Sequence, residues 1–284
     1  MSMQDAPTPR FEAMTAGMVL DQAMRLYARN FPLLVGIIAL AYLPYYILLG
    51  AVTWLMQSNP GSIGVVALTL LGLSLVMMLL WLLVLPLSTG ATSLAVSEKY
   101  LERPVTILAA YSSAFKRFWP VLASQLIVGL AVLAGTFACI VPGVFLWLCW
   151  SMVVPVVMLE QLGPFDSMRR SWDLTDGFRW KILGVAVVVG ILSYALVFGT
   201  TMVAGLAIAF LGNPAGLMTH IITQGITAGA TLLTAPLFSV AVVLLYYDLR
   251  IRKEGFDLVL LNQSLHGEDP DPSDTPPSST LGLT

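Results

Sequence analysis

Six residues at the ends of long apolar stretches carry the side chains best suited to binding chemistry: Glu160, Arg169, Arg170, Trp172, Asp173 and Asp248. The planar guanidinium group of arginine binds phosphate through paired hydrogen bonds. The set could therefore hold an anionic lipid headgroup or contact a partner protein. The alternative is a structural network of ion pairs, and the balance of acidic and basic residues within 160–181 favours that alternative.

A second basic pair, Lys116 and Arg117, directly precedes Phe118 and Trp119. Segment 98–117 carries more basic than acidic residues, and each basic side chain near an anionic membrane surface contributes about 1 kcal/mol of attraction. The pair could therefore contact lipid phosphate. A role in setting the topology of the chain explains the same residues equally well.

Polar residues also recur at helical intervals along the last apolar stretch: His220, Gln224, Thr227, Thr231 and Thr234. A histidine within a membrane span is a functional hypothesis by default, and such a stripe could line a path for a solute. The alternative is helix packing, because hydroxyl and amide groups join membrane helices. Gly225 and Gly229 in the same stretch favour close packing.

No catalytic constellation accompanies these residues. Ser151 and Ser171 lack a nearby base, and Cys139 and Cys149 show neither a disulfide framework nor metal-ligand spacing. We therefore expect no catalytic residue, no metal site and no cofactor, and we interpret the chain as a protein that is not an enzyme.

The composition determines what elements must position these side chains. The chain has 284 residues, of which 57% are hydrophobic and 11% charged, and its mean hydropathy is +0.84. An ordinary soluble domain has about 25% charged residues, so a soluble globule is excluded. The formal net charge of −2 lacks the basic excess of a nucleic-acid-binding protein. A polytopic membrane protein remains.

Three blocks without a charged residue, 30–97, 118–159 and 182–247, provide the spans. Each block is too long for a single crossing, which needs about 20 apolar residues. Each also contains a turn signal near its middle: Asn59-Pro60-Gly61, Pro142-Gly143 and Asn213-Pro214-Ala215-Gly216. Two spans in each block give six transmembrane helices.

The order of spans and charges predicts the topology. Two crossings per block return the chain to the same face, so all 14 Lys and Arg residues lie on one side. Because short basic loops stay in the cytoplasm, we expect both termini there, in a bacterial cytoplasmic (inner) membrane. The N-terminus lacks the pattern of a cleavable signal peptide.

Each pair of spans follows a short amphipathic segment, and an aromatic residue marks each entry into the membrane: Phe31, Trp119 and Trp180. We predict an all-α integral membrane protein with six transmembrane helices in three repeated helix pairs, each preceded by an amphipathic interfacial helix. The repeats cover about 17–103, 104–163 and 164–262. They lie between a flexible N-terminus, 1–16, and a disordered acidic tail, 263–284.

Two motifs resemble a known family. The first comprises Pro142-Gly143-Val144, Trp150, Pro155, Glu160, Gly163-Pro164, 169–175 and 177–180, and the second is 245–258. They are similar to the glycerophosphoryl diester phosphodiesterase membrane-domain family, and the likeness extends over roughly 17–262. Some relatives carry a soluble phosphodiesterase barrel after this unit. We expect none here, because the chain ends soon after Asp248 and the His-Arg-Gly signature of that barrel is missing. The resemblance therefore implies a stand-alone membrane unit.

These observations favour a non-catalytic membrane protein that organises or senses lipid, or a membrane partner, at the cytoplasmic surface. Its partners would be membrane lipids, another membrane protein or a second copy of the chain, and no nucleic acid. One alternative is a transporter or channel for a small or lipid-like solute that uses the stripe from His220 to Thr234. Another is an accessory subunit whose acidic tail recruits a soluble enzyme.

Overall fold

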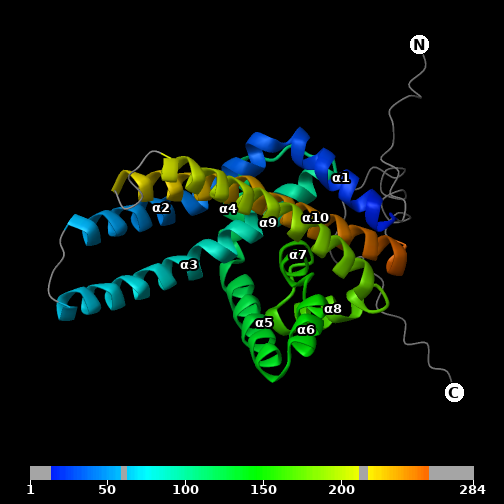
Figure 1. The fold of residues 1–284 in the computed structure, drawn as a ribbon. Helices are drawn as coiled ribbons and strands as arrows, with labels where there is room; N and C mark the ends of the chain where they lie inside the picture. Colours follow the sequence, from blue (N-terminus) through cyan, green and yellow to red (C-terminus); the bar gives the residue numbers. More distant parts are fainter. Residues whose placement is uncertain (1–13, 59–62, 211–216, 256–284) are drawn as a thin grey trace, which may run out of the picture.

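The computed structural model describes residues 14–58, 63–210 and 217–255, which form ten α-helices and no strand (Figure 1). The helices are α1 (Ala16–Arg29), α2 (Phe31–Ser58), α3 (Ile63–Tyr100), α4 (Ile107–Lys116), α5 (Phe118–Ala138), α6 (Ile140–Cys149), α7 (Val153–Leu159), α8 (Pro164–Thr175), α9 (Arg179–Phe210) and α10 (Leu217–Glu254). Six segments are long and apolar enough to span a membrane: Phe31–Val52, Leu70–Tyr100, Phe118–Ala138, Ile140–Leu159, Arg179–Leu206 and Ile222–Glu254. The predicted all-helical membrane class and the number of spans are confirmed.

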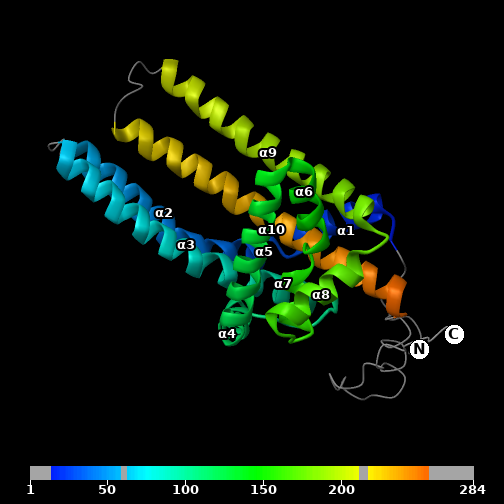
Figure 2. The same ribbon diagram turned by 90° about the horizontal axis from the view of Figure 1, so that it is seen from below.

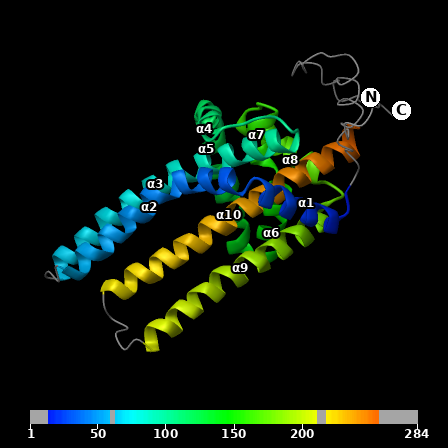
Figure 3. The ribbon, with the colours of Figure 1, turned by 90° about the horizontal axis from the view of Figure 1, so that it is seen from above.

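The long helices pack in pairs, α2 with α3, α5 with α6, and α9 with α10. The α2–α3 and α9–α10 pairs extend in the same general direction, and their connected ends lie at the opposite end of the molecule from the short helices α1, α4 and α8 (Figure 3). The α5–α6 hairpin runs across this direction (Figures 1 and 2). The charged segments therefore gather at one end, around the short helices.

The short helices pack on span helices: α4 contacts α3, α8 contacts α7, and α1 contacts α10. Local sequence explains where these helices begin. The hydroxyl groups of Thr15 and Thr106 accept hydrogen bonds from the first turns of α1 and α4, which satisfies backbone donors there. Pro164 opens α8 at a position where no amide donor is needed. Whether the three pairs are repeats of one unit stays a prediction.

The turn of the second pair differs from the prediction. The chain reverses at Cys139, and both Pro142 and Gly143 lie in the first turn of α6. Proline is tolerated there because the first amides of a helix have no partner inside it. Gly143 lies so close to Thr136 of α5 that a β-carbon would approach the Thr136 backbone to 2.9 Å. The glycine therefore allows close helix contact. The other two predicted turns, 59–61 and 213–216, lie outside the described residues.

The buried core lies at the charged end of the molecule. The largest fully buried side chains there include Tyr246, Leu244 and Leu245 of α10 and Met152 before α7. Farther along the spans, large apolar side chains such as Phe137 and Phe210 are almost fully exposed. Apolar exposure of this extent suits a hydrocarbon surrounding. The buried core is therefore concentrated at the charged end, and the remaining length of the spans exposes apolar side chains suited to contact with lipid.

Candidate membrane-surface site

Asp248, at the end of α10, is the centre of a buried charged cluster. Its side chain is fully buried (0% exposed) and forms ion pairs with Lys181 of α9 and Arg252 of α10. It also accepts a hydrogen bond from the backbone amide of Met14 at 2.6 Å. The Met14 carbonyl in turn accepts from Lys181 at 2.5 Å and from Arg252 at 2.6 Å. The cluster therefore connects Met14, which lies two residues before α1, with helices α9 and α10. We call these four residues the Asp248 cluster.

Glu160, at the end of α7, anchors a second network. It accepts hydrogen bonds from Arg170 of α8 and from the Tyr246 hydroxyl of α10, both at 2.9 Å. Arg170 also pairs with Glu254, and Glu254 pairs with Arg250. Burial alone would lower the pKa of Arg170, but Glu160 and Glu254 raise it above its ordinary value. We call these five residues the Glu160 network. It contains two acids and two arginines, so its formal charges balance.

Hydroxyl groups on the short helices donate to carbonyl oxygens of the spans. Tyr27 of α1 donates to Leu233 of α10 at 2.7 Å, three residues before Pro236 within that helix. Tyr111 of α4 donates to Ile37 of α2 at 2.5 Å. Burial raises the pKa of Tyr27, and it raises the pKa of Tyr111 to about 12, so both phenols keep their protons at neutral pH.

The third short helix uses aliphatic hydroxyls in the same way. Ser171 and Thr175 of α8 both donate to the Cys149 carbonyl, at 2.8 and 3.2 Å, where α6 ends. Ser171 also accepts a hydrogen bond from the Met152 amide at 3.2 Å. A buried backbone group without a partner is costly. These bonds therefore supply partners for the Cys149 carbonyl and the Met152 amide, where the chain breaks between α6 and α7.

The structure separates the six residues that the sequence grouped. Glu160 and Arg170 belong to the Glu160 network, and Asp248 is the centre of its own cluster. Trp172 packs in an edge-to-face arrangement on Phe145, with ring centroids 5.8 Å apart. The Asp173 side chain is exposed, and its backbone carbonyl accepts a hydrogen bond from Lys253. Arg169 is exposed and forms no ion pair with any residue that the structure describes.

A set of aromatic and basic side chains on α4, α5, α8 and α9 is exposed. Trp119, at the start of α5, is 74% exposed, and Trp180, at the start of α9, is 85% exposed. We define the surface belt by these two residues and four other exposed ones: Phe115, Lys116, Phe165 and Arg169. Arg117, beside Lys116, instead donates a hydrogen bond to Gln161 at 2.9 Å. The belt combines aromatic rings with basic groups that lack acidic partners among the described side chains.

The polar stripe of α10 forms many bonds within its own helix. The hydroxyl groups of Thr227, Thr231 and Thr234 donate to carbonyl oxygens one turn earlier, at 2.9, 2.8 and 3.1 Å. Gln224 lies on the same helix and is partly buried, while the side chain of His220 lies outside the described part. Back-bonding of this kind satisfies the hydroxyls without a solute. A role of the stripe as a path stays a prediction.

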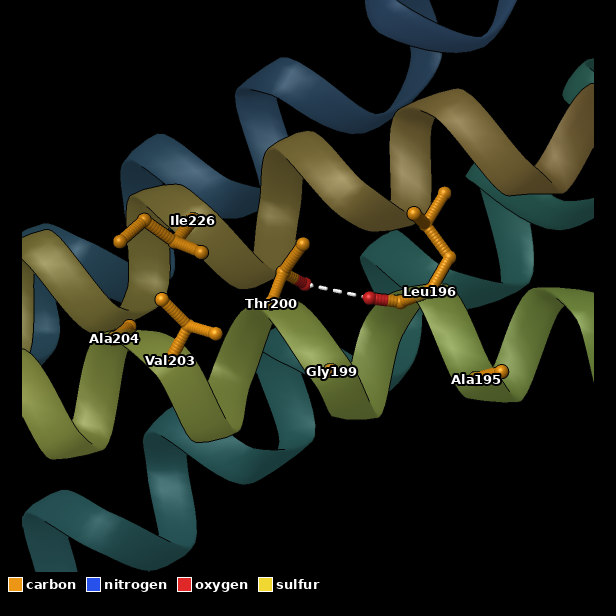
Figure 4. Close-up of a pocket in the computed structure, with 7 residues that line it drawn as sticks. All are labelled: Ala195, Leu196, Gly199, Thr200, Val203, Ala204 and Ile226. Atoms are coloured by element: carbon orange, nitrogen blue, oxygen red, sulfur yellow. Dashed lines mark hydrogen bonds between the residues drawn. The ribbon is translucent and has the colours of Figure 1, made fainter.

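A hollow of about 540 Å³ lies between α9 and α10 (Figure 4). Its lining comprises Ala195, Leu196, Gly199, Thr200, Val203, Ala204 and Ile226. The Thr200 hydroxyl donates to the Leu196 carbonyl at 2.8 Å, so this polar group is satisfied inside α9. The hollow is therefore an apolar surface, and the polar stripe contributes none of its described lining residues.

Several residues of the two networks escaped the sequence reasoning. Arg252 lies four residues after Asp248, and Glu254 lies four residues after Arg250. This helical spacing is a signal that could have predicted both pairs. Lys181 and Met14 gave no such signal, because they reach Asp248 only through the packing of α1 and α9 on α10.

The fold and its charged end define a multi-pass membrane protein. Residues 121–260, from the first turn of α5 past the end of α10, match the family model described as the membrane domain of glycerophosphoryl diester phosphodiesterase. The resemblance to this family is thus confirmed over that range, which contains the Glu160 network and three of the four residues of the Asp248 cluster. Neither curated proteins nor solved structures give a match to the chain.

Proposed function

We propose that this protein is a non-catalytic membrane protein that binds anionic phospholipid headgroups through the surface belt, at the cytoplasmic face of the inner membrane. The carrying observation is the exposure of Trp119 and Trp180 at the starts of α5 and α9, together with two exposed basic side chains, Lys116 and Arg169, that pair with no described acid. Tryptophan is enriched where a membrane meets water. Basic residues at that depth attract anionic lipids.

The Glu160 network supports this assignment, because its two acids keep Arg170 and Arg250 from lipid. Arg170 pairs with Glu160 and Glu254, and Arg250 pairs with Glu254. Lys116 and Arg169 are exposed, and among described residues they have no such partner. The surface belt therefore offers lipid two basic side chains, Lys116 and Arg169, whose charges no described acid neutralises.

Native mass spectrometry of protein released gently from its own membrane tests the proposal. Changing both Lys116 and Arg169 to Gln removes two basic groups worth about 1 kcal/mol each, so the affinity for phosphatidylglycerol falls about thirtyfold. Arg25→Gln is the control, because the Arg25 side chain is also exposed but already pairs with Asp21 at 2.9 Å.

The proposal requires that wild-type protein carries anionic phospholipid and that the control variant retains it. Equal lipid on the double variant and the wild type would contradict a role of the belt. Wild-type protein that carries another polypeptide and no lipid would also contradict it, and would support a scaffold for a membrane partner.

A further inference from the structure

The Asp248 cluster points two cationic groups at one neutral oxygen. The Lys181 ammonium and the Arg252 guanidinium both donate to the Met14 carbonyl, at 2.5 and 2.6 Å. The Met14 backbone amide also donates a hydrogen bond to the Asp248 carboxylate. The three side chains thus hold both polar backbone groups of a single residue against the ends of α9 and α10.

The formal charges of this cluster do not balance. Asp248 supplies one negative charge, while Lys181 and Arg252 supply two positive charges. The Arg252 guanidinium also lies over the ring of Phe178, 5.6 Å from the ring centroid, and this ring carries no charge. A neutral carbonyl accepts from both cations but leaves one positive charge uncompensated. An anionic oxygen in its place would form stronger bonds and would balance the cluster.

We propose that Lys181 and Arg252 form a binding site for a phosphate group, and that the Met14 backbone occludes this site by occupying the place of a phosphate oxygen. The proposal rests on the proposed function for the class of ligand, since an anionic phospholipid is the phosphate-bearing molecule most available at a membrane surface. The present proposal adds regulation. The site is closed while the Met14 carbonyl accepts from Lys181 and Arg252, and it opens when a phosphate group displaces the Met14 backbone.

The position of the cluster makes this exchange feasible. The Lys181 side chain is 14% exposed and the Arg252 side chain 29% exposed, so both reach the surface, whereas Asp248 does not. Lys181 follows Trp180, a residue of the surface belt. The cationic pair therefore lies at the depth where the belt meets headgroups, and Asp248 remains behind it as an internal counter-ion.

A pair of substitutions at Met14 tests the occlusion. Met14→Pro removes the amide that donates to Asp248, while Met14→Ala retains the backbone donor and acceptor and loses only the side chain. A site that is mostly occluded binds its ligand more weakly by the fraction of molecules that are open. We expect the proline variant to bind phosphatidylglycerol about tenfold more tightly than the alanine variant. Adding Arg252→Gln to the proline variant should abolish that gain.

Purified protein in zwitterionic nanodiscs, titrated with phosphatidylglycerol or with inorganic phosphate, gives the readout. A gain with phosphatidylglycerol alone identifies a lipid headgroup site, and a gain with both identifies a site for phosphate from either source. No gain with either ligand overturns the inference. Lys116→Gln with Arg169→Gln, combined with each Met14 variant, separates the two proposals. These changes should lower the affinity of both Met14 variants for phosphatidylglycerol and leave the ratio of the two affinities unchanged.

Amide hydrogen exchange of the wild-type protein supplies a test that needs no variant. The Met14 amide should exchange slowly in zwitterionic nanodiscs and at least several-fold faster when phosphatidylglycerol is present. Exchange that is equally slow in both lipids would overturn the occlusion even if the proline variant fails to fold.

Discussion

Two neighbouring arginines of α8 have opposite environments. Arg170 is held between Glu160 and Glu254, and its partners extend to Tyr246 and Arg250 in the core. Arg169 is exposed, and no described acidic side chain pairs with it. Residues next to each other on a helix point about 100° apart, so Arg170 faces the protein and Arg169 faces outward. Under the proposed function, charge at this end serves two purposes, structure in the Glu160 network and attraction of lipid in the surface belt.

The largest expected effect comes from Asp248→Ala. The change leaves Lys181 and Arg252 without their acid, and removing one partner of a buried ion pair typically costs about 3–5 kcal/mol. Chemical denaturation in detergent micelles measures the loss. Asp21→Ala is the control, because Asp21 pairs with Arg25 on an exposed face and should cost less than about 1 kcal/mol. Equal losses would contradict a structural role for the Asp248 cluster.

Glu160→Gln should have the next largest effect. The amide preserves the shape of the side chain but removes the charge that Arg170 and Tyr246 contact. Hydrogen bonds to charged groups contribute about 1.5–3 kcal/mol, and we expect a loss in that range by the same denaturation assay. Glu102→Gln, at an exposed site between α3 and α4, should leave stability unchanged. If Glu160→Gln is also neutral, the Glu160 network does not stabilise the fold.

Ser171→Ala tests the break between α6 and α7. It removes a donor to the Cys149 carbonyl and an acceptor for the Met152 amide, both buried. Stability should fall by about 1–3 kcal/mol, measured as a lower denaturation midpoint. Ser112→Ala on the exposed side of α4 is the control. A comparable loss of stability in the control variant would show that Ser171 does not specifically stabilise the break between α6 and α7.

Trp180→Ala should have the smallest effect on the fold. The side chain is 85% exposed, so stability in detergent should change by less than about 0.5 kcal/mol. In vesicles that contain phosphatidylglycerol, a fluorophore placed beside α9 should lie closer to water in the variant, because an interfacial anchor is lost. If the fluorophore lies at the same depth in the variant and the wild type, Trp180 is not an interfacial anchor and does not belong to the surface belt.

The number of spans and the short helices before them could be predicted from the sequence, because apolar length and the segregation of charge determine both. The position of the second turn could not be predicted: the sequence indicates a turn at Pro142-Gly143, whereas the chain reverses at Cys139. The sequence shows that these residues disfavour a helix interior, but Cys139 has no signal of its own, and the first turn of α6 tolerates Pro142. Close contact between Gly143 and Thr136 depends on the packing of α5 against α6.

The candidate site was only partly predictable. Glu160 and Arg170, which the sequence places in one set, form an ion pair, whereas the same reasoning assigns Arg169 and Arg170 one role. Their difference depends on which face of α8 packs against α7 and α10. The contact between Met14 and Asp248 joins residues 234 positions apart, and no local spacing predicts it. Interfacial roles of the belt residues and a solute path along α10 stay predictions.

The most direct test of the account compares Arg169→Gln with Arg170→Gln in two measurements on the same preparations, the midpoint of thermal unfolding and the number of anionic lipids retained by native mass spectrometry. Arg170→Gln should lower the midpoint and leave the lipids retained per folded molecule unchanged. Arg169→Gln should keep the midpoint and lose lipid. If both variants change the same quantity to the same extent, the division between structural and lipid-binding charge is wrong.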